Sequence, residues 1–212
     1  MKSCFHPNQI EIGLDEAGRG CLFGPVFTAG VVWDGSFHPE IRDSKKLSES
    51  KRQEMKQYIE KHSLHYSVTP LDNHFIDTHN ILHSTISGWH TCIRKITQDI
   101  PVDLILVDGP NFDFYIDKDE EIIPHQCVTK GDDLYLSIAA ASILAKTYRD
   151  EWICQLVETY PELNKYNLKQ NKGYGTKDHR DAIRNYGITP WHRQSFGICK
   201  QYAKTNNVIK NN

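Results

Sequence analysis

Two adjacent carboxylates and a glycine-rich turn stand together near the start of the chain. Asp15 and Glu16 open the hexapeptide DEAGRG at residues 15–20, directly after an apolar run at residues 10–14 that indicates a β-strand. Carboxylates at a strand end can hold a divalent metal ion, and the backbone N–H groups of a glycine-arginine-glycine turn can hold phosphates. Together these groups suit hydrolysis of a phosphodiester. Taken alone, the hexapeptide also suits an ordinary turn.

Two further acidic positions follow in the sequence. Asp108 comes after the continuous apolar run LILV at residues 104–107, which indicates a strand buried on both faces, and Asp132 precedes a long helical pattern. Side chains just past the carboxyl ends of strands converge on the open edge of an α/β sheet. Carboxylates gathered there would repel each other without a cation, and oxygen ligands favour Mg²⁺ or Mn²⁺ over zinc.

Each of these acidic residues also has an ordinary structural interpretation. Asp132 alone would suit a helix N-cap, and Asp108 could cap the turn that follows its strand. Asp133 competes with Asp132 for either role. The local sequence leaves these alternatives open.

The pattern of apolar residues predicts the elements that would position these groups. Early strands in succession, then strands separated by helices, predict an α/β fold with a mixed five-stranded sheet flanked by helices. The small residues that open the helix after residue 137 would let it pack closely on the sheet. The expected strands are residues 10–14, 26–33, 64–69, 104–107 and about 121–128, and the expected helices are 48–62, 81–96, 137–160 and 177–186.

Length and composition indicate one globular domain. The 212 residues, 39% hydrophobic and 25% charged, predict a single domain over residues 1–212, with a core at about 10–160 and a helical, basic C-terminal portion at about 161–205. No apolar run is long enough to span a membrane, and we expect no signal peptide, because residues 1–8 are short and polar. The six cysteines are scattered without a Cys-x-x-Cys pair, which disfavours structural zinc and predicts a cytoplasmic protein.

The net charge of −2 hides a strong asymmetry along the chain. From Asn164 onward there are ten lysines and arginines, opposed only by Asp178 and Asp181. An acidic body with a basic terminal region suits an enzyme that binds a polyanion and carries a carboxylate metal site. A solvated basic helix face is the alternative interpretation.

Several motifs in order make the chain resemble the type 2 ribonucleases H, and among them the bacterial ribonuclease HII family. The resemblance runs from about Glu11 to Tyr202. Small departures occur at Cys21, Phe23 and Gly175, where the family often has proline, alanine and proline. The motifs are GLDEAGRG at residues 13–20 followed by GPV at 24–26, DSKKL at 43–47, VDG at 107–109, KGD at 130–132, SIAAASILAK at 137–146, KGYGT at 172–176 and HRQSF at 192–196.

The resemblance implies an RNase H-like fold and a set of site residues. It carries the metal-binding, catalytic carboxylates onto Asp15, Glu16, Asp108 and Asp132. It also implies that the N–H groups of residues 18–20 (Gly18, Arg19 and Gly20) grip the backbone around a ribonucleotide and sense its 2′-hydroxyl. Tyr174 would pack on the sugar of the adjoining deoxynucleotide at an RNA–DNA junction. The 2′-hydroxyl is the group that separates RNA from DNA at a given site.

The expected activity is metal-dependent hydrolysis of RNA hybridised to DNA, or embedded in it, on the 5′ side of a ribonucleotide. Two divalent ions, Mg²⁺ or Mn²⁺, are expected during catalysis, one held mainly by Asp15 and Asp108 and one shared with Glu16 and Asp132. The products would be a 3′-hydroxyl and a 5′-phosphate. The candidates for substrate phosphate contacts are Lys45, Lys46, Lys172, Lys177, Arg180 and Arg193.

The expected partners are an RNA–DNA hybrid and duplex DNA that contains ribonucleotides, without a membrane, and the chain is expected to act as a monomer. No peptide that would recruit a replication clamp stands out in residues 204–212, so the sequence names no protein partner. Two alternatives are another nuclease or integrase-like enzyme on the same fold, and a non-catalytic hybrid-binding module. The first has no use for residues 18–20 and Tyr174, and the second has no use for the carboxylates.

Overall fold

The computed structural model describes residues 1–36, 38–42 and 44–203, so Asp43 of the expected DSKKL motif and the tail at residues 204–212 lie outside the described residues. The described chain forms two compact units. The expectation of a single domain over residues 1–212 stays a prediction. Unit 1 comprises Met1–Ala17, Phe27–Pro70 and Thr85–Tyr148, and unit 2 comprises Gly18–Val26, Leu71–Ser84 and residues from Arg149 onward.

A five-stranded mixed sheet forms the centre of unit 1, as predicted. Its order is β3-β2-β1-β4-β7. Strand β1 pairs antiparallel with β2 and parallel with β4, and β4 pairs parallel with β7. The strands are β1 (Glu11–Ala17), β2 (Val26–Val32), β3 (His65–Leu71), β4 (Leu104–Asp108) and β7 (His125–Val128).

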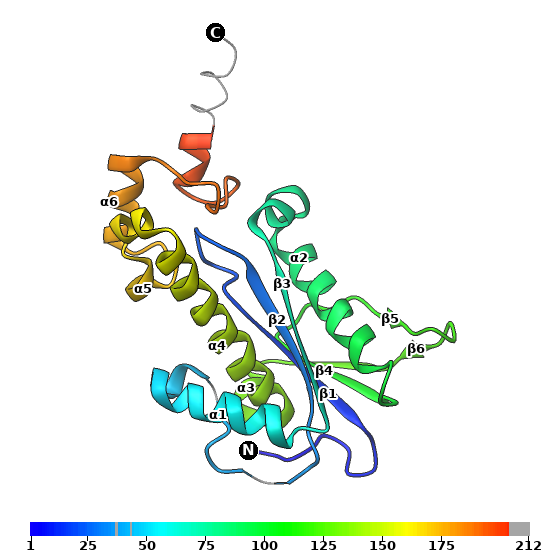
Figure 1. The fold of residues 1–212 in the computed structure, drawn as a ribbon. Helices are drawn as coiled ribbons and strands as arrows, with labels where there is room; N and C mark the ends of the chain where they lie inside the picture. Colours follow the sequence, from blue (N-terminus) through cyan, green and yellow to red (C-terminus); the bar gives the residue numbers. More distant parts are fainter. Residues whose placement is uncertain (37, 43, 204–212) are drawn as a thin grey trace. The chain divides into compact units, whose positions relative to one another are not determined.

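One face of this sheet is covered by α1 (Glu49–His62) and by the first half of α4 (Leu136–Thr159) (Figure 1). Ser48 caps α1 as predicted, since its side chain accepts a hydrogen bond from the Lys51 N–H. Alanines of α4 pack with Met55 and Ile59 of α1 in one apolar cluster. The small residues let α4 approach closely: a Cβ on Gly13 of β1 would lie 2.3 Å from the Ser137 carbonyl carbon.

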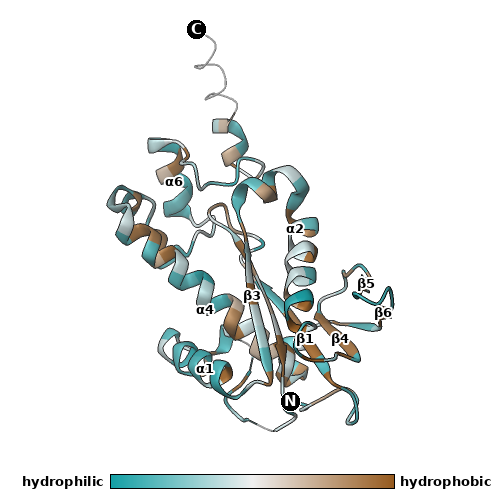
Figure 2. Cartoon of the chain, turned by 45° about the vertical axis from the view of Figure 1, so that its right-hand side comes forward, coloured by the Kyte–Doolittle hydropathy of each residue, from teal (hydrophilic) through white to brown (hydrophobic). Residues whose placement is uncertain are grey.

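The other face is covered by the second half of α2 (Asn73–Ile96) (Figure 1). Asn80 interrupts this helix with φ 63°, and its Oδ1 accepts hydrogen bonds from the N–H groups of Leu82 and His83. Asn80 therefore acts as an N-cap for the helix that was predicted to begin at Ile81. Figure 2 shows hydrophobic colouring on β1 and β4, which are neighbours in the sheet, and on parts of the helices.

The expected strand at residues 121–128 is divided in two. β6 (Ile122–Ile123) pairs with β5 (Tyr115–Ile116) in a separate hairpin, and only β7 joins the main sheet. Pro124 lies between them, and proline cannot donate to a sheet ladder. The short helix α3 (Gly131–Leu134) and a 3₁₀ turn, η1 (Ser44–Lys46), were not predicted, because such short elements carry no periodic pattern.

Unit 2 is mainly helical. Phe23, Ile153, Leu163 and Ile183 lie in one buried apolar cluster. Helix α6 agrees with the prediction, and Thr176 caps it. The helical elements after α4 are η2 (Pro161–Tyr166), α5 (Leu168–Asn171) and α6 (Lys177–Tyr186). None of the helices in the described ranges combines the length and apolarity that a membrane span requires.

Candidate metal centre and recognition loop

Three aspartates from separate segments meet in unit 1. Each of Asp15, Asp108 and Asp132 offers a carboxylate oxygen, and these oxygens all lie within 4.8 Å of one another. Asp15 and Asp132 are each only 5% exposed. In the parallel pairing of β1 with β4, Leu14 lies opposite Val107, so the next residues, Asp15 and Asp108, reach the same edge of the sheet. Both aspartates lie within the last residues of their strands, not just past the ends as expected.

Asp132 is brought to the group by α3. The Asp108 Oδ1 accepts a hydrogen bond of 2.7 Å from the Gly131 N–H, which fixes the start of α3 beside β4. Asp132 lies inside the first turn of α3, and the N-cap position is Lys130, in a left-handed conformation without a side-chain cap. The N-cap interpretation of Asp132 is therefore wrong. Asp133, the competitor, pairs instead with the Lys46 ammonium.

The electrostatics of this group favour a cation. Burial, followed by the charges of Glu16 and Asp108, raises the pKa of Asp15 well above its ordinary value. Burial and the charge of Asp132 likewise raise the pKa of Asp108. Buried, neighbouring carboxylates are costly to ionise without a positive partner. Because every ligand atom in the group is a carboxylate oxygen, the donor set fits a hard divalent ion.

Glu16 lies next to Asp15 in β1 but does not belong to the group within 4.8 Å. Successive side chains of a strand point to opposite faces, which separates its carboxylate from that of Asp15. Its charge is still near enough to raise the pKa of Asp15. The role of Glu16 as a metal ligand stays a prediction.

Two lysines of η1 lie beside the aspartates. The Lys45 Nζ lies 3.2 Å from the Asp132 Oδ2, and Lys46 pairs with Asp133. The buried hydroxyls of Ser44 and Ser142, 3.0 Å apart, attach η1 to α4. The structure thus holds positive charge at the edge of the sheet where the three aspartates meet.

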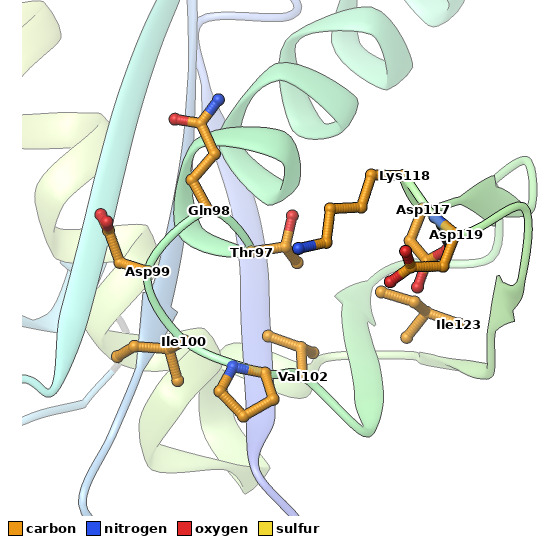
Figure 3. Close-up of a pocket in the computed structure, with 10 residues that line it drawn as sticks. Thr97, Gln98, Asp99, Ile100, Val102, Asp117, Lys118, Asp119 and Ile123 are labelled. Carbon is orange, nitrogen blue, oxygen red and sulfur yellow. Dashed lines mark hydrogen bonds between the residues drawn. The ribbon is translucent and has the colours of Figure 1, made fainter.

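A separate hollow in unit 1 does not include these aspartates. It has a volume of about 350 Å³ and lies between the end of α2 and the hairpin loop (Figure 3). Its lining residues are Thr97, Gln98, Asp99, Ile100, Pro101, Val102, Asp117, Lys118, Asp119 and Ile123.

The expected recognition residues lie together in unit 2. Gly18 has φ +96°, a conformation that favours glycine, and Gly20 has open space around its Cα. The Leu22 N–H donates to the Gly173 carbonyl over 2.9 Å, which joins this loop to the segment that carries Tyr174. Tyr174 is 43% exposed. The loop at residues 18–20 and Tyr174 are therefore parts of one surface of unit 2.

Arg193 does not lie where a phosphate contact requires it. Its side chain is fully buried, with Nε donating to the Gly24 carbonyl over 2.8 Å and Nη1 to the Arg19 carbonyl over 2.9 Å. The expectation that Arg193 touches phosphate is therefore corrected: its guanidinium supports the loop from inside. Lys172 is half-buried, with its Nζ 3.5 Å from the Cys154 Sγ.

Several supporting residues of unit 2 escaped the sequence analysis. Arg149 is fully buried and donates to backbone carbonyls, including that of Lys172 over 2.7 Å. Asp77 accepts hydrogen bonds from the N–H groups of Gln194 and Ser195, each 2.8 Å long. The sequence signal that could have revealed the role of Arg149 was its position, as an arginine, inside the apolar helix pattern at residues 138–157.

Comparisons with known proteins agree with this geometry. The sequence profile of the family described as Ribonuclease HII matches residues 12–199. Ribonuclease HII of Flavobacterium psychrophilum is 42% identical over 95% of this chain and 97% of that protein, and ribonuclease HII of Parabacteroides distasonis is 46% identical over 91% and 92%.

Solved structures share the fold. The PCNA:RNase HII complex from Archaeoglobus fulgidus matches with a TM-score of 0.68 and 25% identity, over 89% of this chain and 96% of that one. Ribonuclease H2 from Pyrococcus horikoshii OT3 matches with a TM-score of 0.70 and 20% identity, over 95% and 99%. With the family profile covering most of its length and relatives above 40% identity, this chain belongs to the ribonuclease HII family.

Proposed function

We propose that this chain is an endoribonuclease that hydrolyses the RNA strand of RNA–DNA hybrids and nicks duplex DNA on the 5′ side of an embedded ribonucleotide. The cut would leave a 3′-hydroxyl and a 5′-phosphate. The observation that carries the proposal is the meeting of Asp15, Asp108 and Asp132, from three separate segments, within 4.8 Å. Membership of the ribonuclease HII family supplies the substrate class.

The aspartates would hold divalent ions, either Mg²⁺ or Mn²⁺. Asp15 and Asp108 would supply most ligands of one ion, and Asp132 with Glu16 those of a second. Bound ions of this kind activate a water molecule and neutralise charge on the phosphoryl group. The chain's own contribution is to keep three carboxylates close together, with Asp15 and Asp132 buried and Asp108 half-buried, where burial and like charge would otherwise favour protonation. A cation reverses that preference, since it attracts the ionised form.

Residues of unit 2 would choose the substrate. N–H groups at residues 18–20 would hold the backbone at the ribonucleotide and sense its 2′-hydroxyl, and the exposed ring of Tyr174 would pack on the neighbouring deoxyribose. The covalent chain joins both groups of residues, since only Ala17 separates Glu16 from Gly18. The ammonium groups of Lys45 and Lys46 would attract the substrate phosphates, which makes binding sensitive to salt.

Cleavage assays on three duplexes test this proposal: one containing a single ribonucleotide, one long RNA–DNA hybrid, and one of DNA alone. With Mg²⁺ or Mn²⁺, we expect a nick 5′ of the single ribonucleotide, multiple cuts in the hybrid, and an intact DNA duplex. With a chelator, we expect no cleavage. Cutting of the all-DNA duplex would favour the alternative of a general nuclease on this fold.

A pair of isosteric substitutions tests which aspartates act. Asp108→Asn should bind the ribonucleotide-containing duplex normally but cut it at least about a hundredfold more slowly, because metal-assisted charge stabilisation is worth several kcal/mol. Asp133→Asn is the matched control, since Asp133 lies outside the group of three and pairs with Lys46. It should keep its activity. Normal turnover by Asp108→Asn would remove Asp108 from the site.

We infer that the chain acts as a monomer, because one polypeptide carries every group named above. Sedimentation analysis at assay concentrations measures this directly. The cytoplasmic location expected from the scattered cysteines stays a prediction.

A further inference from the structure

We propose that Arg149 is a positioning residue for substrate recognition: its buried guanidinium sets the spacing between the loop at residues 18–25 and the segment that carries Tyr174. Arg193 would support the same loop as a second buried guanidinium. This inference rests on the proposed function, because it assigns a task to the surface that would read the RNA–DNA junction. All of the residues involved belong to unit 2.

Arg149 binds both segments at once. Its Nε donates to the Pro25 carbonyl over 3.1 Å, and its Nη2 donates to the Phe23 carbonyl over 3.1 Å. Its Nη1 donates to the Lys172 carbonyl over 2.7 Å, two residues before Tyr174. The planar guanidinium of Arg149 therefore fixes the end of the loop at residues 18–25 against Lys172, at the start of the segment that carries Tyr174. The Arg149 Cζ lies 6.0 Å from the centre of the Tyr174 ring.

Arg193 holds the same loop at two other points. Its Nε donates to the Gly24 carbonyl and its Nη1 to the Arg19 carbonyl, so it reaches into the glycine-arginine-glycine turn itself. The Arg193 N–H also donates to the Leu22 carbonyl. Both guanidinium groups are fully buried and give these hydrogen bonds to backbone carbonyls. A buried guanidinium that donates to backbone carbonyls orders the backbone. Loss of any of these hydrogen bonds would leave a buried donor or carbonyl oxygen without a partner, which is energetically costly.

Both segments have a glycine where the Arg149 side chain passes close to the backbone. A Cβ on Gly18 would lie 2.1 Å from the Arg149 Nε, and one on Gly173 would lie 3.2 Å from the Arg149 Nη2. Gly18 and Gly173 also have φ of +96° and +80°. The glycine requirement at these positions is thus partly a requirement for space around Arg149. The Arg149 side chain therefore lies between residues 18–20 and residues 173–174 and holds the two segments in a fixed arrangement.

Arginine suits this role in a way that lysine does not. A guanidinium offers several N–H donors in one fixed plane, whereas an ammonium is a point charge that cannot span three carbonyls held by different segments. Arg149→Lys therefore keeps the positive charge, but it no longer fixes the distance between the loop at residues 18–25 and the segment that carries Tyr174. A small change in the distance between the amides of residues 18–20 and Tyr174 should matter most for a duplex with a single ribonucleotide, because both groups must contact that junction at the same time.

The test compares two substrates in the full-length protein with Mg²⁺. We expect Arg149→Lys to lower kcat/KM on a duplex with a single ribonucleotide by roughly tenfold to a hundredfold more than on a long hybrid, the range that about 1 Å of misplacement can produce. Combining Arg149→Lys with Tyr174→Ala should cost less than the two separate losses together, because both changes remove the same junction contact. Arg94→Lys, an exposed arginine of unit 1, is the matched control and should leave both rates unchanged.

The outcomes separate this inference from the proposed function. If the wild-type enzyme leaves the duplex with a single ribonucleotide uncut, the proposed function fails at the junction. If the wild type cuts at the ribonucleotide but Arg149→Lys loses both activities equally, Arg149 is only structural and the inference is overturned. Additive losses with Tyr174→Ala would overturn it as well.

A measurement on the wild type covers the case in which Arg149→Lys does not fold. Native-state hydrogen exchange should give equal protection to the Leu22 and Tyr174 amides, which are hydrogen-bonded to the Gly173 and Asn171 carbonyls, because one guanidinium holds both segments in a single cooperative unit. Independent opening of these two amides would contradict the inference whatever the variants do.

Discussion

At the scale of single residues, the aspartate group links metal binding to stability. Asp15 and Asp108 have raised pKa values, caused first by burial and then by neighbouring carboxylates. The folded metal-free protein therefore holds protons more tightly at these two aspartates than the unfolded chain does, in which the pKa of aspartate is about 3.9. Their contribution to stability is present at low pH and is lost as pH rises from that value through the raised pKa values.

A divalent ion should offset this loss. At a hundred times its Kd, a bound ion stabilises the folded state by about 2.7 kcal/mol, which corresponds to roughly 5–10 °C in Tm for a chain of this size. We expect Mg²⁺ or Mn²⁺ to raise the Tm clearly at pH 8 and much less at pH 5, where protons compete. Thermal melts at the two pH values, with Asp133→Asn as a control that behaves like the wild type, measure this. Equal shifts at both pH values would contradict it.

The same residues show what sequence can predict at this scale. Asp15 and Asp108 were expected together because each follows an apolar run, and the sheet confirms that they meet. Arg193 was expected to contact a substrate phosphate, which requires an accessible side chain. Its burial depends on carbonyls of residues 19 and 24, far away in the sequence, and no local pattern encodes such a partner. Arg149 escaped for the same reason.

At the scale of elements, α4 approaches β1 closely at Gly13. A Cβ on Gly13 would lie 2.3 Å from the Ser137 carbonyl carbon and 2.4 Å from the Ile138 nitrogen, both backbone atoms that cannot rotate away. Gly13→Ala should therefore destabilise the fold by roughly 1–3 kcal/mol or more through overpacking. Urea denaturation measures the change.

Gly20→Ala is the matched control for stability, since nothing lies within 4 Å of the Cβ it would add. Its effect on the free energy of unfolding should stay within about 0.5 kcal/mol. If Gly13→Ala is as stable as Gly20→Ala, the close approach of α4 to β1 does not exist.

The elements were predicted best where periodicity is long. Apolar runs predicted β1, β2 and β4, and Ser48 was correctly predicted to cap α1. The second half of α2 was predicted from apolar spacing alone, and its cap at Asn80 was recognised only in the structure. The hairpin of β5 and β6 was missed because two-residue strands show no alternation. The short helices α3 and α5 were missed for a similar reason.

At the scale of the whole molecule, the sequence predicted an acidic body and a basic terminal region, and the structure divides the chain differently. The boundary between the two units falls within α2, between Ser84 and Thr85, and within α4, between Tyr148 and Arg149. A boundary inside continuous helices leaves no glycine- or proline-rich linker for sequence analysis to find. Residues 18–26 and 71–84 also join unit 2 from the early part of the chain, which composition alone does not indicate.

Calorimetric titration with Mn²⁺ at pH 8, without substrate, tests most directly whether Asp15, Asp108 and Asp132 jointly bind a divalent ion. The wild type and Asp133→Asn should bind Mn²⁺ with the same affinity, and Asp108→Asn should bind at least about tenfold more weakly, a loss of about 1.4 kcal/mol or more. Unchanged Mn²⁺ affinity in Asp108→Asn, with the fold intact by circular dichroism, would contradict the account.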